Sequence, residues 1–232
     1  MAALSSGFID EKYVVLTERT ATMIKIVRDR LRGVAIALAL AGVTMAPTWA
    51  ADRTLMLYGD SLMAGLGLSD QDGFAGQLQA ALGDDIAIVN ASVSGDTSAD
   101  GLARLDWSLG ERPDAAVLEL GANDMLQGLP VDAMRQNLTA ILQRFEDENI
   151  PVLLAGMRAS PSLGGDYVRS YEAVFPQLAA QFNIAFYPFF LDGVATNRSL
   201  NQPDGMHPNA EGVRTIVHAT LPLIKALLGD EN

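Results

Sequence analysis

Residues 54–62 read Thr-Leu-Met-Leu-Tyr-Gly-Asp-Ser-Leu, a short and mostly apolar run followed by a glycine and two polar residues. An apolar run of this length that ends at a glycine is typical of a strand buried on both faces, as in a parallel sheet. Gly59 permits a tight turn, so Ser61 is expected just beyond the carboxyl end of the strand. Open α/β sheets form their binding sites at that end. The stretch therefore predicts a parallel sheet and a site beside it.

The same apolar pattern recurs downstream and alternates with segments of helical spacing. Strands are expected at 54–58, 86–90, 115–120, 151–155 and 184–187. Helices are expected at 74–82, 98–109, 131–148 and 167–182, and a last helix from Pro208 to about Leu228 with a bend near Pro222. This alternation predicts an α/β fold, a three-layer α/β/α sandwich with a central five-stranded parallel sheet.

Composition and charge narrow the class of protein. The chain has 232 residues, of which 49% are hydrophobic and 19% charged, which suits one globular domain preceded by a leader. The formal net charge is −12, and six of the sixteen basic residues precede position 51. The remaining chain is strongly acidic and would repel phosphate backbones, so no nucleic-acid partner is expected. Cysteine is absent, which excludes disulfides and thiolate metal sites.

The N-terminus has the order of a secretory signal peptide. A basic cluster at 25–32 is followed by the apolar run 34–43 and by Thr48-Trp49-Ala50. The run is shorter than the roughly 20 residues that span a bilayer. We expect residues 1–50 to be an N-terminal extension and signal peptide cleaved near Ala50, with Met23 a candidate for the true start, and residues 51–232 to be the functional domain. A periplasmic or secreted protein without stable membrane insertion is predicted.

Two further polar segments stand where strands or helices are expected to end. Gly121-Ala122-Asn123-Asp124 follows the third strand, where the Asn123 amide could donate a hydrogen bond into a cleft. The alternative interpretation is an ordinary turn, since glycine and asparagine are common turn residues. In the first segment, Asp60 and Ser61 could likewise serve only to cap a short helix.

The third segment is Pro203-Asp204-Gly205-Met206-His207-Pro208, before the last helix. Pro208 restricts the backbone of His207 to an extended conformation. A carboxylate at Asp204 can accept a hydrogen bond from one imidazole nitrogen and leave the other free as a base. A metal site is disfavoured, because the chain has only two histidines and no cysteine. The second histidine, His218, is expected to be a partly exposed residue of the last helix.

Together these segments resemble the SGNH (GDSL-type) hydrolase family. The matching positions are Gly59-Asp60-Ser61, Gly95, Gly121-x-Asn123-Asp124 and Asp204-x-x-His207, in the family's order. The stretches 90–98 and 118–124 are most similar to the bacterial periplasmic thioesterase I, lysophospholipase and arylesterase subgroup. The resemblance covers nearly all of residues 53–228 and implies the flavodoxin-like fold of that family.

The resemblance also implies the roles of individual residues. Ser61 would be the nucleophile, His207 the general base and Asp204 the group that orients it, with an oxyanion hole formed by the N–H groups of Ser61 and Gly95 and the Asn123 side chain. Asp60 would support the loop. These roles agree with the chemistry, because a serine hydroxyl needs a base and the developing oxyanion needs donors already in place. No cofactor is expected.

The expected substrate is a small acyl or aryl ester or thioester. Leu62, Met125, Leu126 and Pro161 border the expected site and would suit an acyl chain or an aromatic ring, although some of these residues could instead close the core. Carbohydrate O-deacetylation, also found in the family, is the main alternative, and few aromatic residues near the site speak against it. A non-catalytic module that binds a small anion at the first loop is the remaining alternative.

Overall fold

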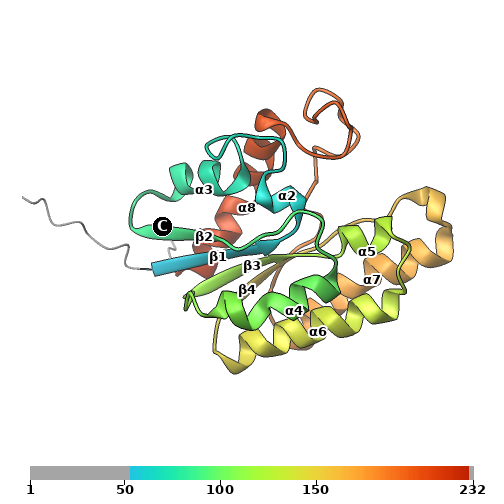
Figure 1. Cartoon of the computed structure of the whole chain (residues 1–232), viewed down its shortest axis with the longest axis horizontal. Coiled ribbons are helices and arrows are strands. Elements are labelled where there is room, and N and C mark those ends of the chain that lie inside the picture. The colour runs from blue at the N-terminus through green and yellow to red at the C-terminus, as the bar shows by residue number, and fades with distance from the viewer. Residues whose placement is uncertain (1–52, 230–232) are drawn as a thin grey trace, which may run out of the picture. The chain divides into compact units, whose positions relative to one another are not determined.

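The sheet contains five parallel strands in the order β2-β1-β3-β4-β5 (Figure 1). The computed structural model describes residues 53–229. The strands are β1 (Arg53–Gly59), β2 (Ile86–Asn90), β3 (Ala115–Glu119), β4 (Val152–Ala155) and β5 (Ala185–Tyr187). The chain leaves β1 for β2 on one side and returns to β3 on the other, so the topological switch point lies between β1 and β3. The segments that begin at Asp60 and Leu120 follow these two strands.

Helices cover both faces of the sheet (Figure 1). One layer contains α3 (Phe74–Leu82) and α8 (Ala210–Leu227), and the other contains α4 (Ser98–Leu109), α6 (Val131–Asp147) and α7 (Gly165–Phe182). The predicted three-layer α/β/α sandwich is therefore confirmed. Three short helices are also present: α2 (Ser61–Ala64), which the sequence offered only as a capped turn, and α5 (Ala122–Leu126) and η1 (Pro161–Leu163), which were not expected. They follow β1, β3 and β4, and each is too short to show a helical hydrophobic period.

The start of the last helix differs from the prediction. The helix begins at Ala210 and not at Pro208, because Asn209 is its N-cap and its side chain accepts hydrogen bonds from the N–H groups of Glu211 and Gly212. Pro208 instead forms an isolated antiparallel bridge with Asn201. The helix also continues through Pro222 to Leu227. The extra residues between His207 and the helix keep the histidine on a loop that is braced by its own backbone pairing.

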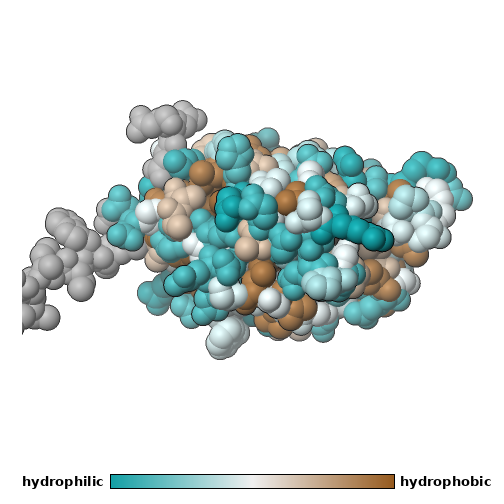
Figure 2. All heavy atoms as spheres, turned by 90° about the horizontal axis from the view of Figure 1, so that it is seen from above, coloured by the Kyte–Doolittle hydropathy of each residue, from teal (hydrophilic) through white to brown (hydrophobic). Residues whose placement is uncertain are grey.

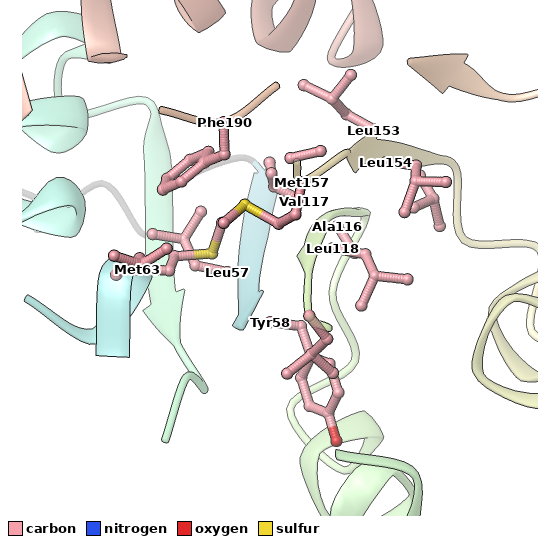
Figure 3. Packing of buried hydrophobic residues seen from close by; sticks show 14 of the residues in the cluster. Leu57, Tyr58, Met63, Ala116, Val117, Leu118, Leu153, Leu154, Met157 and Phe190 are labelled. Atoms are coloured by element: carbon pink, nitrogen blue, oxygen red, sulfur yellow. The ribbon is translucent and has the colours of Figure 1, made fainter. Parts of the chain in front are cut away.

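The core lies on both sides of the sheet. Leu55, Met56, Leu57 and Tyr58 of β1 are all fully buried, as a strand covered by helices on both faces requires. Successive side chains point to opposite faces, and Figure 3 shows Leu57 near Met63 while the Tyr58 ring lies on the other side of the strand. The site therefore stands on a rigid, fully packed strand.

The surface is mixed in character. On the face shown in Figure 2, hydrophilic residues predominate and apolar ones are scattered between them. Within residues 53–229, no helix has the length and apolarity needed to cross a membrane. The predicted signal peptide and its cleavage near Ala50 lie outside the described residues.

Candidate active site

Three polar side chains that are distant in the sequence meet beyond the carboxyl end of β1. Ser61 Oγ lies 2.9 Å from His207 Nε2, and His207 Nδ1 lies 2.6 Å from Asp204 Oδ2. A carboxylate only accepts hydrogen bonds, so Nδ1 carries a proton and donates a hydrogen bond to the Asp204 carboxylate. In the neutral imidazole Nε2 is then the acceptor, and the Ser61 hydroxyl donates to it. The geometry gives a serine hydroxyl with a base in hydrogen-bond contact and a carboxylate behind that base.

Asp204 is held in place as well as being held ionised. Its Oδ1 accepts the main-chain N–H groups of Met206 and His207 at 2.9 and 3.0 Å. The hydrogen bond from the His207 ring, followed by those main-chain donors, lowers the pKa of Asp204 to about 2. The carboxylate therefore stays charged at every pH at which the fold is expected to function.

A glutamine that sequence patterns did not single out connects the histidine loop to the serine loop. Gln202 donates its main-chain N–H to the His207 carbonyl at 2.8 Å, and its own carbonyl accepts the Gly205 N–H at 2.9 Å. Its side-chain amide donates to the carbonyl of Leu66 at 2.7 Å. The Leu66 N–H in turn donates to the Ser61 carbonyl at 3.1 Å. This chain of hydrogen bonds fixes the two loops relative to each other.

The N–H groups of Ser61 and Gly95 are available as donors. Within residues 53–229, neither N–H group donates a hydrogen bond to another residue. Gly95 has a φ of 92°, a backbone conformation that other residues rarely adopt, and a side chain there would face open space. The glycine thus leaves room for a ligand atom to approach.

The Asn123 amide is held more tightly than the sequence suggests. Asn123 Nδ2 donates both to Asp60 Oδ2, at 3.0 Å, and to the main-chain carbonyl of Asp96, at 2.9 Å. An amide nitrogen carries two hydrogens, so both are engaged. A hydrogen bond from Asn123 to a substrate oxygen would have to replace one of these contacts. The contact with the Asp96 carbonyl comes from the same loop as Gly95.

Asp60 is the fully buried N-cap of α2. Its Oδ1 accepts the Leu62 N–H at 3.0 Å while Oδ2 accepts from Asn123, so the capping interpretation is confirmed for Asp60. Burial is the main cause that raises the pKa of this carboxyl to about 6, partly opposed by the Leu62 N–H and by the nearby His207. Ser61 is the first residue of the helix that Asp60 caps, so its position depends on this carboxylate.

The four residues expected to line a substrate site have different environments. Leu62 is only 8% exposed and belongs to the hydrophobic core. Met125 is half-buried, and its sulfur accepts the N–H of Ser160 at 3.4 Å. Leu126 and Pro161 are exposed. Only the last three therefore present much surface to a ligand.

Most of the exposed large apolar side chains of the described chain surround the same loops. We call this set the apolar rim: Leu66, Val93, Leu126, Leu163 and Met206. The Leu66 N–H donates a hydrogen bond to the Ser61 carbonyl, and the Val93 N–H donates one to the Gly59 carbonyl. Met206 directly precedes His207 in the chain. The sequence placed Leu66, Leu126 and Leu163 in apolar loops that border the site, and of these it named Leu126 as a substrate contact. The rim thus places exposed apolar side chains on loops that carry or adjoin the residues of the site.

No alternative metal centre accompanies these residues in the part of the chain that the structure describes. Within residues 53–229, no three histidine and acidic side chains are grouped so that they could hold a metal ion. His218 is exposed on α8, away from the loops of the site, as the sequence predicts. The chemistry that the described residues offer is that of an activated serine.

Residues 57–215 match the model of the GDSL-like Lipase/Acylhydrolase family. The chain is 41% identical to the esterase TesA of Pseudomonas aeruginosa over 183 residues, which cover 77% of this chain and 91% of that protein. It is 37% identical to the thioesterase 1/protease 1/lysophospholipase L1 of Escherichia coli K12 over 163 residues, or 70% of this chain and 78% of that protein. The crystal structure of the psychrotrophic esterase EstA from Pseudoalteromonas, inhibited by monoethylphosphonate, superposes with a TM-score of 0.72 at 34% identity and covers 77% of this chain and 100% of EstA.

Proposed function

Because this chain belongs to the GDSL-like Lipase/Acylhydrolase family, we propose that it hydrolyses carboxylic esters and thioesters of acyl and aryl groups through an acyl-enzyme on Ser61. The observation that carries the proposal is the contact of Ser61 Oγ with His207 Nε2 at 2.9 Å, with Asp204 Oδ2 2.6 Å from the other ring nitrogen. In this arrangement the proton of the imidazole is on Nδ1, so Nε2 is free to act as the base.

In the first half of the reaction, Ser61 Oγ attacks the carbonyl carbon of the substrate while its proton passes to His207 Nε2. The carbonyl oxygen becomes an oxyanion, which accepts hydrogen bonds from the Ser61 and Gly95 N–H groups and from Asn123. Asn123 makes this bond by exchanging its contact with the Asp96 carbonyl. The tetrahedral intermediate then collapses, the bond to the leaving alcohol or thiol breaks, and His207 gives that group its proton.

In the second half, water attacks the acyl group on Ser61. His207 takes a proton from the water as the new bond forms, and it returns that proton to Ser61 Oγ as the acyl–oxygen bond breaks. The products are a carboxylic acid and the free enzyme. Asp204 stays ionised throughout and stabilises the imidazolium that forms in each half.

The apolar rim supports acyl or aryl substrates over acetylated sugars. Exposed leucine, valine and methionine side chains favour contact with a hydrocarbon chain. The tryptophan of the described residues, Trp107, lies on α4 and is not part of the rim. A platform of aromatic rings, which a sugar would favour, is therefore missing from the rim residues. Carbohydrate O-deacetylation remains the second candidate only on the ground of family breadth.

We expect kcat/KM for p-nitrophenyl esters to rise with acyl chain length by at least about tenfold from acetyl to octanoyl, because each buried methylene contributes about 0.8 kcal/mol. Acyl-CoA and lysophospholipid substrates in the same assay should be hydrolysed, and acetylated xylo-oligosaccharides should not. The variant Leu126→Ser tests the rim itself: it should weaken the length dependence, whereas acetyl esters, which are too short to need the rim, should be hydrolysed as in wild type. Faster release of acetate from the sugar than from any ester would favour the second candidate.

We further propose that the protein is exported. The support is the basic, apolar and small-residue order of positions 25–50 in the sequence. Expression of the full chain in a Gram-negative host should place a protein that starts at or next to Ala51 in the periplasmic fraction, as read by intact mass. The variant Leu38→Arg, which interrupts the apolar run, should remain unprocessed inside the cell. An unprocessed wild-type chain in the cytosolic fraction would contradict export.

A further inference from the structure

A second carboxyl group lies directly beneath the loop that carries Ser61. Glu119 is the last residue of β3, is fully buried, and is paired in register with Gly59 of β1. A methyl group at position 59 would come within 2.8 Å of both the main-chain oxygen and Oε2 of Glu119. Gly59 therefore leaves the space that the Glu119 side chain occupies, in addition to any role in the turn. The proposed mechanism has not used this acid.

The contacts of Glu119 suit a neutral acid better than an ionised one. Its Oε2 accepts the main-chain N–H of Asp60 at 3.4 Å, and its buried Oε1 receives no hydrogen bond from any described residue. A buried carboxylate with an oxygen that receives no hydrogen bond is strongly unfavourable. An oxygen that carries a proton needs an acceptor instead. Asp60, whose N–H already contacts Glu119 Oε2, carries the carboxylate that we assign as this acceptor.

We infer that Glu119 is a positioning residue: as a neutral acid it donates a hydrogen bond to the Asp60 carboxylate, accepts the Asp60 N–H, and so fixes the group that orients Asn123. The inference rests on the proposed function, because the orientation of Asn123 affects turnover only if its amide faces the reacting carbonyl. Glu119 does not touch the substrate. It acts through Asp60, whose two oxygens hold Leu62 and Asn123.

The electrostatics of the pair agree with this assignment. Burial raises the pKa of Glu119 well above its ordinary value, and the negative charge of Asp60 raises it further. Burial is the main cause that raises the pKa of Asp60 to about 6. The nearby His207 and the hydrogen bond with Glu119 lower this pKa, and the charge of Asp96 raises it. Tyr171 of α7, whose hydroxyl donates to the Gly121 carbonyl, also interacts electrostatically with Glu119. Between pH 6 and the pKa of Glu119, the two carboxyls therefore hold one proton between them.

The direction of the pH effect follows. Below its raised pKa, Glu119 is neutral and the hydrogen bond to Asp60 is present. As the pH rises through that pKa, the proton is lost and two like charges face each other in a buried environment, so the loop of Ser61 loses its fixed geometry. The alkaline fall of wild-type kcat that accompanies this ionisation should therefore belong to Glu119.

The test compares Glu119→Gln with Glu119→Leu in p-nitrophenyl ester hydrolysis. Glutamine keeps the shape, donates to Asp60 through its amide and accepts the Asp60 N–H, so kcat should stay within about threefold of wild type. Leucine keeps similar volume without either hydrogen bond, so kcat should fall about tenfold to a hundredfold while KM changes less than about twofold. The alkaline fall of kcat in wild type should be absent from Glu119→Gln, because an amide does not titrate.

Two controls separate the possible outcomes. Leu142→Ala creates a cavity in α6, distant from this pair, and should lower thermal stability without lowering kcat, which separates a positioning effect from general destabilisation. The infrared spectrum at neutral pH should contain a band of a protonated buried carboxyl in wild type that Glu119→Gln lacks, and this readout does not depend on turnover. If wild type hydrolyses none of the esters, the proposed function fails whatever the spectrum shows. If wild type is active, equal kcat in Glu119→Leu or a wild-type spectrum without the protonated-carboxyl band would overturn the inference. If Glu119→Leu does not fold, the infrared band, present in wild type and absent from Glu119→Gln, still decides.

Discussion

Replacement of Ser61 by alanine lowers kcat for ester hydrolysis by about 10⁴- to 10⁶-fold, the range expected when a nucleophile is removed from a site whose other groups remain. The cause is loss of the nucleophile whose proton passes to His207 in the first half of the reaction, so that no acyl-enzyme can form. A fluorophosphonate reagent, which reacts with activated serine hydroxyls, should label wild type with one equivalent and leave Ser61→Ala unlabelled. Intact mass after labelling measures this directly, and peptide mapping places the adduct.

The matched control is Ser69→Ala, in the loop that follows the helix of Ser61. Ser69 Oγ donates to the Asp72 carboxylate and has no contact with the imidazole, so its removal should leave both labelling and kcat unchanged. Labelled Ser61→Ala, or a variant that keeps a tenth of wild-type turnover, would show that another group is the nucleophile. His207→Gln should abolish labelling of Ser61 as well, since the hydroxyl would then lack its base.

Replacement of Asn123 by alanine lowers kcat by about 10²- to 10³-fold and changes KM less than about twofold, the pattern of a donor that acts mainly in the transition state. The structure explains why the ground state should be little affected. Both amide hydrogens already have acceptors, Asp60 Oδ2 and the Asp96 carbonyl, before any substrate is present. Exchange of the second acceptor for an oxyanion is favourable only when negative charge develops on the substrate oxygen.

Steady-state kinetics over the substrate panel gives the kcat and KM values for Asn123→Ala. The control is Asn137→Ala on α6, whose amide donates to Ser98 Oγ and lies outside the proposed machinery, so kcat should remain at the wild-type level. A change confined to KM would remove Asn123 from the oxyanion hole and leave it as a residue that binds substrate or supports Asp60. Equal losses for both variants would indicate a general effect of loosening the loops.

The local features were predictable because each depends on neighbouring residues in the chain. The apolar runs predicted all five strands to within a residue or two, since burial on both faces imposes a simple pattern. The start of the last helix was predicted two residues too early. The sequence favoured Pro208 as the first helical residue and did not show that Asn209 would be the N-cap. The Asp204 and His207 pair is similarly local, and three residues of separation bring the carboxylate to the ring.

The sequence alone determined the parallel α/β class, the glycine turn before Ser61 and the polar residues at the strand ends. Only the tertiary structure decided that Glu119 lies beneath Asp60, that Gln202 connects the two loops, and that the hydrogens of Asn123 already have acceptors. Those contacts join β1 to β3 and one loop to another across long stretches of chain, and their distances are set by strand register and burial. Periodicity and spacing report only which residues are close along the chain, whereas the charge on a buried acid depends on which groups fold against it.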